Sequence, residues 1–189
     1  MDANEAKTLG ADTRKRMESA IEHVRRELAG VRTGRASVNL LDPVQVEAYG
    51  TLMPLNQVAT LSVPEPTIIV AQPFDPSLSS AIERAIQKSP LGLNPASDGK
   101  VIRIPVPALT EERRKELSRL VHRYAEEGRN AVRQIRRDAN DRLKKMLKDH
   151  AISEDDERRG LDEVQKITDQ HVALIDDLQT KKDAELLGR

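Results

Sequence analysis

The feature that most constrains this chain is a helical pattern that continues from Thr110 for roughly 40 residues, and therefore for about 60 Å. Apolar residues recur in it every three or four positions, which is the spacing of one face of a helix. A helix this long with a single apolar stripe is unstable alone in water and has to pack along other helices. The predicted stripe comprises Leu117, Val121, Tyr124, Gly128, Ile135, Ala139, Leu143 and Met146.

Two other stretches can supply the partner helices. One covers residues 4–29 and is followed by Gly30, a helix stop signal. The other begins at Ser153, where four consecutive acids suit the positive end of a helix dipole. With a tight turn near 150–153, these stretches predict an elongated antiparallel three-helix bundle. The predicted seam residues are Met17, Ile21, Val24 and Leu28 in the first stretch, and Leu161, Val164, Thr168, His171, Ile175 and Leu178 in the second.

The segment between the first and second helices has a different composition. Nine of the ten prolines lie between residues 31 and 106. Alternating apolar residues predict a strand at 44–48 and a turn at Gly50–Thr51. Further strands are predicted at 58–63, 67–71 and 101–104, and a short helix at 77–89. The predicted fold class is therefore α+β, with a small β/α/β domain (31–105) inserted in a bundle formed by residues 1–30 and 106–189.

The charge of the chain is unevenly distributed, although its formal total is zero. Residues 111–150 carry 13 Lys and Arg against 8 Asp and Glu, whereas residues 151–189 carry 11 acids against 6 bases. Within the basic segment, Arg129, Arg133 and Arg136 share one helical stripe that we expect to face away from the apolar seam. This stripe is either a solvated face or a surface for phosphates, and the dense run of arginines favours a nucleic acid. Since aromatic residues are only 2% of the chain, we expect recognition of a structured backbone rather than of single-stranded bases.

Motifs for catalysis or metal binding are absent from the sequence. There is no cysteine, and the four histidines form neither an i, i+4 pair nor an HExxH motif. Residues 92–100 lack the spacing of a phosphate loop, and the acids at 154–157 are explained as a helix start. We therefore expect no enzyme activity, no metal and no cofactor, and a packed His171. The polar N-terminus and the lack of a long apolar run predict a soluble, cytoplasmic protein that contacts no membrane.

Stretches along nearly the whole chain resemble the ribosome recycling factor family, in order and with matching spacing. They are VRTGRAS at 31–37, LLDPVQVEAYG at 40–50, PLNQVA at 54–59, LGLNP at 91–95, IRIPVPALTEERRKEL at 102–117, AVRQIRRDAN at 131–140, ISEDD at 152–156 and VQKITD at 164–169. The main alternative is a coiled-coil adaptor without an RNA target. It explains the helical seams but neither the inserted domain nor the RTGRA motif.

The resemblance implies a function and a set of contact residues. The protein would act as a monomer, binding the large subunit of the post-termination ribosome along its ribosomal RNA. Elongation factor G would then use GTP to drive the subunits apart. The arginines that contact RNA in the family correspond to Arg32, Arg35, Arg133 and Arg136, and with less weight to Arg129. The alternative role for Arg32 and Arg35 is to cap a helix terminus.

Two short segments connect the predicted domains, Gly30–Val31 on one side and Pro105–Val106–Pro107 on the other. Proline fixes φ and lacks a backbone donor, so the second segment is kept out of helix and sheet. The family carries its small domain on a hinge, and we expect the hinge at these residues. The alternative is that the prolines only end a strand and precede a helix.

Overall fold

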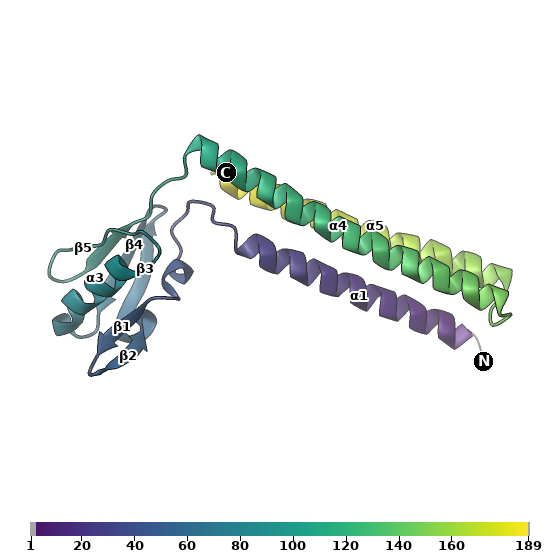
Figure 1. Ribbon diagram of the computed structural model, residues 1–189, viewed down its shortest axis with the longest axis horizontal. Coiled ribbons are helices and arrows are strands. Elements are labelled where there is room, and N and C mark those ends of the chain that lie inside the picture. Colours follow the sequence, from purple (N-terminus) through teal and green to yellow (C-terminus); the bar gives the residue numbers. More distant parts are fainter. Residues whose placement is uncertain (1–2, 189) are drawn as a thin grey trace. The chain divides into compact units, whose positions relative to one another are not determined.

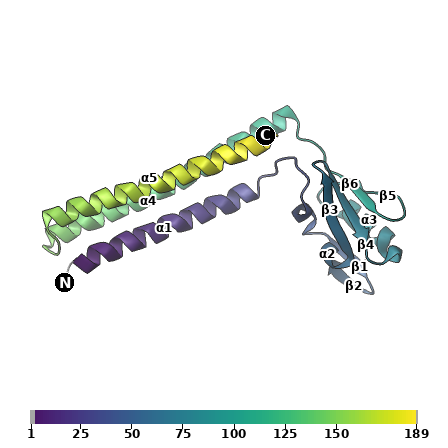
Figure 2. The ribbon, with the colours of Figure 1, turned by 180° about the vertical axis from the view of Figure 1, so that it is seen from behind.

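The computed structural model describes residues 3–188, and the chain divides into two compact units (Figures 1 and 2). One unit combines the two ends of the chain, up to Thr33 and from Glu111 onward, and the other is the continuous segment Gly34–Thr110. The small unit is thus inserted in the sequence of the large one. These boundaries fall a few residues after those expected from the sequence, 30/31 and 105/106.

The large unit is a bundle of the long helices α1 (Ala3–Ala29), α4 (Glu111–Lys148) and α5 (Glu154–Leu186). The helices lie side by side, and α4 runs opposite to α1 and α5 (Figures 1 and 2). The turn between α4 and α5 passes through His150, which has a φ of +57°. The antiparallel three-helix bundle predicted from the apolar spacing is therefore confirmed.

Small and branched side chains fill the core of the bundle. The four predicted seam residues of α1 are all buried, as is His171, whose Nδ1 lies 2.7 Å from the carbonyl oxygen of Ile167. The buried face of α4 passes through Ala125 and Val132, which the predicted stripe omitted. The predicted stripe took Tyr124 in place of its neighbour Ala125 and left a step of seven residues from Gly128 to Ile135, where Val132 lies on the buried face. The predicted seam residues that are only half-buried are Tyr124, Met146, Leu161 and Leu178.

The small unit contains two antiparallel sheets. A hairpin joins β1 (Gln45–Ala48) to β2 (Thr51–Pro54), and the second sheet has the strand order β3-β4-β6-β5. Its strands are β3 (Ala59–Glu65), β4 (Ile68–Pro73), β5 (Ala96–Ser97) and β6 (Ile102–Pro105). The helical elements are α2 (Leu55–Val58), α3 (Ser79–Lys88) and the 3-10 turns η1 (Val38–Leu41) and η2 (Pro76–Leu78). The α+β class is confirmed.

The small unit has its own apolar core, which one face of α3 closes. Ile82 and Ile86 of α3 are fully buried, in a cluster that includes Val46 of β1, Ile69 of β4 and Ile104 of β6. Burying each such side chain contributes roughly 1.5–3 kcal/mol to folding. Each unit thus has its own apolar core, which supports the elements that carry the functional side chains.

Candidate nucleic-acid interface

The arginine stripe of α4 borders the neighbouring helix α5 rather than facing wholly away from it. Arg129 is the clearest case, because its side chain is only 12% exposed. The expectation that the whole stripe faces away from the apolar seam is therefore wrong for this residue. A helical wheel of α4 alone could not reveal this, since the result depends on how α5 is rotated about its own axis.

Arg129 is held by acceptors on both helices. Its Nε donates to Oδ1 of Asp176 at 2.8 Å, and its Nη2 donates to Oε1 of Gln179. On its own helix, Nη1 donates to Oε2 of Glu126 at 3.1 Å. The hydrogen bonds from Arg129 and Arg133 hold the pKa of Glu126 below its usual value, so this carboxylate is ionised at neutral pH. Every guanidinium nitrogen of Arg129 already has a protein partner.

Arg133 is engaged at one nitrogen and more open to solvent. Its Nη1 lies 3.3 Å from Oε1 of Glu126 and 3.3 Å from Oδ1 of Asn130, and 45% of its side chain is exposed. Among the described residues, no acceptor is recorded for its Nε or Nη2. These two groups form one edge of the guanidinium fork, which is the edge that a phosphate can accept from bidentately.

Arg136 lies beside a shallow groove of about 310 Å³ between α4 and α5. Its Nη1 is 3.4 Å from Oε1 of Gln165, and Gln165 in turn donates to Asp169 at 2.8 Å. Its Nε is buried and has no hydrogen-bond partner in the described chain. A buried donor without a partner carries a desolvation cost in this arrangement of the side chain. Arg133 also lines this groove, so the structure brings these two predicted contact residues together.

Arg32 and Arg35 lie on either side of the boundary between the units, and both are exposed. Backbone donors close the end of α1: the N–H of Gly30 donates to Arg26 and Glu27, and that of Val31 to Leu28. No capping contact by the Arg32 or Arg35 side chain is recorded within residues 3–188. Gly34 between them has a φ of +78°, and a Cβ there would lie 2.9 Å from Cγ of Leu109. The glycine of the RTGRA motif is thus required by its backbone conformation and by space.

Comparison with known proteins identifies the family of the chain that carries these arginines. The family model described as "Ribosome recycling factor" matches residues 24–187. The ribosome-recycling factor of Bradyrhizobium diazoefficiens is 53% identical over 93% of this chain and 94% of its own length. That of Methylobacterium nodulans is 51% identical over 94% of this chain and 95% of its own.

The chain belongs to the ribosome recycling factor family.

Solved structures of ribosome recycling factors agree with this assignment over the whole fold. One solution structure of a recycling factor superposes with a TM-score of 0.73 at 41% identity, covering 98% of both chains. A second, with a TM-score of 0.61 and 50% identity, covers 97% of this chain and 99% of its own. This second structure is described as models for the T. thermophilus ribosome recycling factor and the E. coli elongation factor G bound to the E. coli post-termination complex. As a member of this family, the chain is a non-enzymatic translation factor for ribosome recycling rather than a coiled-coil adaptor.

Most of the predicted hinge residues are held firmly within one unit or the other. Gly30 and Val31 complete the end of α1, and Pro105 is paired with Ile68 at the end of β6. Val106 is buried in the core of the small unit, and its N–H donates to the carbonyl oxygen of Thr67 at 2.7 Å. The stretches left between the units are therefore Arg32–Thr33 and 107–110. A hinge at this junction remains a prediction.

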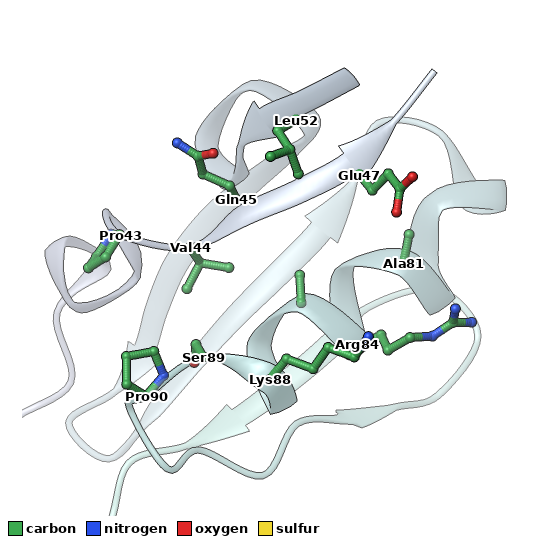
Figure 3. Close-up of a pocket in the computed structure, with 11 residues that line it drawn as sticks. Pro43, Val44, Gln45, Glu47, Leu52, Ala81, Arg84, Lys88, Ser89 and Pro90 are labelled. Carbon is green, nitrogen blue, oxygen red and sulfur yellow. The ribbon is translucent and has the colours of Figure 1, made fainter. Parts of the chain in front are cut away.

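The small unit contains a groove that is lined by none of the arginines that the family resemblance singles out. It has a volume of about 530 Å³ and is bordered by the β1–β2 hairpin and α3 (Figure 3). Arg84 and Lys88 line it from α3, and Glu47 lies on the hairpin side, so its charge is mixed. Val44, Ala81 and Ala85 make part of its lining apolar.

Metal-ligand clusters and membrane-spanning helices are not found in the part of the chain that the structure describes. Residues 3–188 contain no group of three or more His, Cys, Asp or Glu side chains placed to hold an ion. No helix in this range is long and apolar enough to cross a membrane. Two of the four acids at the start of α5 have protein partners: Asp155 pairs with Arg158, and Asp156 pairs with Ser153 and Arg159.

Sequence reasoning missed the polar partners of the arginines. Glu126 lies on the same stripe of α4, three residues before Arg129 and seven before Arg133, so its spacing could have indicated it. Asp176 and Gln179 could not be found in this way. Their contact with Arg129 depends on the register between α4 and α5, which no motif encodes.

Proposed function

We propose that this protein binds the large subunit of the post-termination ribosome, with the α4 arginines against ribosomal RNA. Elongation factor G and GTP then drive the dissociation of the ribosome from mRNA for a new round of translation. The proposed RNA contacts are Arg133 and Arg136 in the bundle, and Arg32 and Arg35 at the junction. The protein acts as a monomer in the cytoplasm.

The observation that carries the proposal is that Arg133 and Arg136 line one groove, with the Nε and Nη2 of Arg133 unengaged by any described residue. Arginine binds phosphate oxygens bidentately, and a structured RNA presents them at regular spacing. The partner named in the description of the T. thermophilus neighbour supports the role given to elongation factor G.

The test is a ribosome-binding and ribosome-splitting assay on Arg133→Ala and Arg136→Ala. Each substitution should weaken binding by roughly 5- to 150-fold, because a lost charged contact to RNA costs about 1–3 kcal/mol. The melting temperature should barely change, since exposed charges contribute little to stability. Arg158→Ala is the matched control, because Arg158 is 74% exposed and pairs with Asp155 of the same helix.

The splitting assay needs elongation factor G and GTP and compares each variant at ribosome concentrations below and above its dissociation constant. A variant that only binds weakly should recover at high concentration. If both variants bind and split ribosomes as well as Arg158→Ala, the stripe is a solvated face and the proposal is wrong.

A further inference from the structure

A continuous chain of polar side chains links α5 to the proposed RNA-contact residue Arg133. This chain, here called the Arg129 relay, consists of Arg129, Glu126, Asp176 and Gln179. The chain begins at Asp176 and Gln179 on α5, which accept from Arg129. It continues through Glu126, which accepts from Arg129 with Oε2 and from Arg133 with Oε1. The two oxygens of one carboxylate thus join a nearly buried arginine to a half-exposed one.

Arg129 and Arg133 differ in burial, and this difference indicates different roles. Only 12% of the Arg129 side chain is exposed, against 45% of that of Arg133. All three guanidinium nitrogens of Arg129 donate within the protein, whereas Arg133 uses only Nη1. A phosphate that bound Arg129 side-on, at Nε and Nη2, would displace its acceptors Asp176 and Gln179 on α5. Arg133 can bind one without giving up Glu126.

We propose that Arg129 and Glu126 are positioning residues, which hold Arg133 with its Nε–Nη2 edge turned outward for an RNA phosphate. The proposal rests on the proposed function, because it assumes that Arg133 contacts RNA. It also changes the role of Arg129, which the family resemblance places among the RNA contacts. A long arginine side chain that is ordered before binding loses less entropy when the complex forms.

Replacing Glu126 distinguishes positioning from simple electrostatics by the sign of the effect. Glu126→Gln removes a negative charge close to the RNA site, so electrostatics alone would tighten binding. If Glu126 orients Arg133, the same change should weaken ribosome binding by roughly two- to tenfold, the range for ordering one long side chain. Glu127→Gln is the matched control, because Glu127 is the adjacent acid, is 60% exposed and contacts only Arg123 at 3.9 Å.

Arg129→Lys is a second, independent variant. Lysine keeps the charge and can still serve a phosphate as a point charge, but it cannot reach three acceptors with a planar fork. Direct RNA contact by Arg129 predicts a loss that persists in an Arg133→Ala background, because lysine cannot bind a phosphate bidentately. The relay predicts a loss similar to that of Glu126→Gln. In an Arg133→Ala background, neither change should weaken binding further, because both act through Arg133.

The experiment measures ribosome affinity for the single and double variants of the full chain, with melting temperatures to verify folding. Weaker binding by Glu126→Gln and Arg129→Lys, lost in the Arg133→Ala background, supports the relay. Glu126→Gln that binds as tightly as Glu127→Gln overturns the relay alone, provided that Arg133→Ala is weakened. Arg133→Ala with normal affinity overturns both the relay and the proposed RNA contact.

Discussion

At the scale of single residues, one glycine sets how closely two helices of the bundle approach. Gly128 is buried in α4, and a Cβ built on it would lie 2.3 Å from Cγ2 of Val24 in α1 and 3.3 Å from Cδ1 of Ile175 in α5. Real Cβ atoms essentially never come that close to another atom. The branched Val24 side chain has no flexible end that could move aside, so an added methyl would push α1 away from α4.

We expect Gly128→Ala to destabilise the bundle by about 1–3 kcal/mol, the usual cost of overpacking. This sign is informative, because Gly→Ala in a helix interior otherwise stabilises by about 1 kcal/mol. Gly10→Ala is the control, since a Cβ there meets only the end of the flexible Glu163 side chain, at 3.0 Å. Urea unfolding measures the stability of both variants. Equal stability of the two variants would show that the α1–α4 contact is not tight at Gly128.

The sequence placed Gly128 on the apolar stripe but could not say why a glycine stands there. Spacing identifies a face of a helix, whereas the need for a missing side chain arises from a second helix. The same limit applies to Arg129. Its type and spacing predicted a phosphate ligand, but its burial against Asp176 depends on the rotation of α5. Arg133 and Arg136 were placed together correctly because their proximity arises within one helix.

At the scale of elements, the start of α5 is determined by a capping box. The Ser153 hydroxyl accepts from the N–H of Asp156 at 3.1 Å, and the Asp156 carboxylate accepts from the N–H of Ser153 at 3.3 Å. A hydrogen bond from the Ser153 hydroxyl is also the largest cause that lowers the pKa of Asp156. The sequence located the start of α5 correctly from its run of acids, one of which, Asp156, closes this capping box.

We expect Ser153→Ala to cost about 1 kcal/mol of stability at neutral pH, as for other lost N-caps. Because the pKa of Asp156 is lowered in the folded state, its contribution is present above its unfolded pKa and is lost as pH falls through the folded value. The substitution removes much of that lowering, so the difference between wild type and variant should shrink in acid. Thermal melts at neutral and acidic pH measure this difference in stability. A constant or growing difference would contradict the assigned capping role.

Elements of the small unit were predicted less completely than the long helices. β1 was predicted correctly, but its partner β2, the two-residue strand β5 and the one-turn helix α2 were missed. The hairpin turns at Tyr49–Gly50 rather than at Gly50–Thr51, with φ values of +52° and +77°. Such a turn needs positive φ at both residues, and tyrosine is an unusual choice at the first. Short elements that depend on their neighbours leave little periodicity in the sequence.

At the scale of the whole molecule, charge governs how the protein should approach RNA. If three to five phosphates are contacted, the logarithm of ribosome affinity should fall with the logarithm of salt concentration at a slope of roughly −2 to −4. Arg133→Ala should lower the magnitude of this slope by about one. Titrations at several salt concentrations measure both slopes. A flat response would contradict phosphate binding as the basis of recognition.

The two units are joined by two short stretches, and we expect motion between them to be needed for recycling but not for binding. Pro105 and Val106 are held in the small unit by sheet pairing and burial, so bending is expected at Arg32–Thr33 and within 107–110. Pro107 fixes its own φ in the second stretch, so we expect the motion to be confined to a restricted arc. Reorientation would let the bundle remain bound to RNA while the small unit transmits a push from elongation factor G.

An engineered disulfide between the units tests this, because the chain has no cysteine of its own. The oxidised protein should bind ribosomes normally through the bundle arginines but split them more slowly, and reduction should restore the rate. The two single-cysteine variants, treated with the same oxidant, control for the substitutions and for oxidation itself. Full splitting activity in the locked protein would show that the motion is not required. The push would then pass through the two units as one body, and the prolines would serve only to end β6 and precede α4.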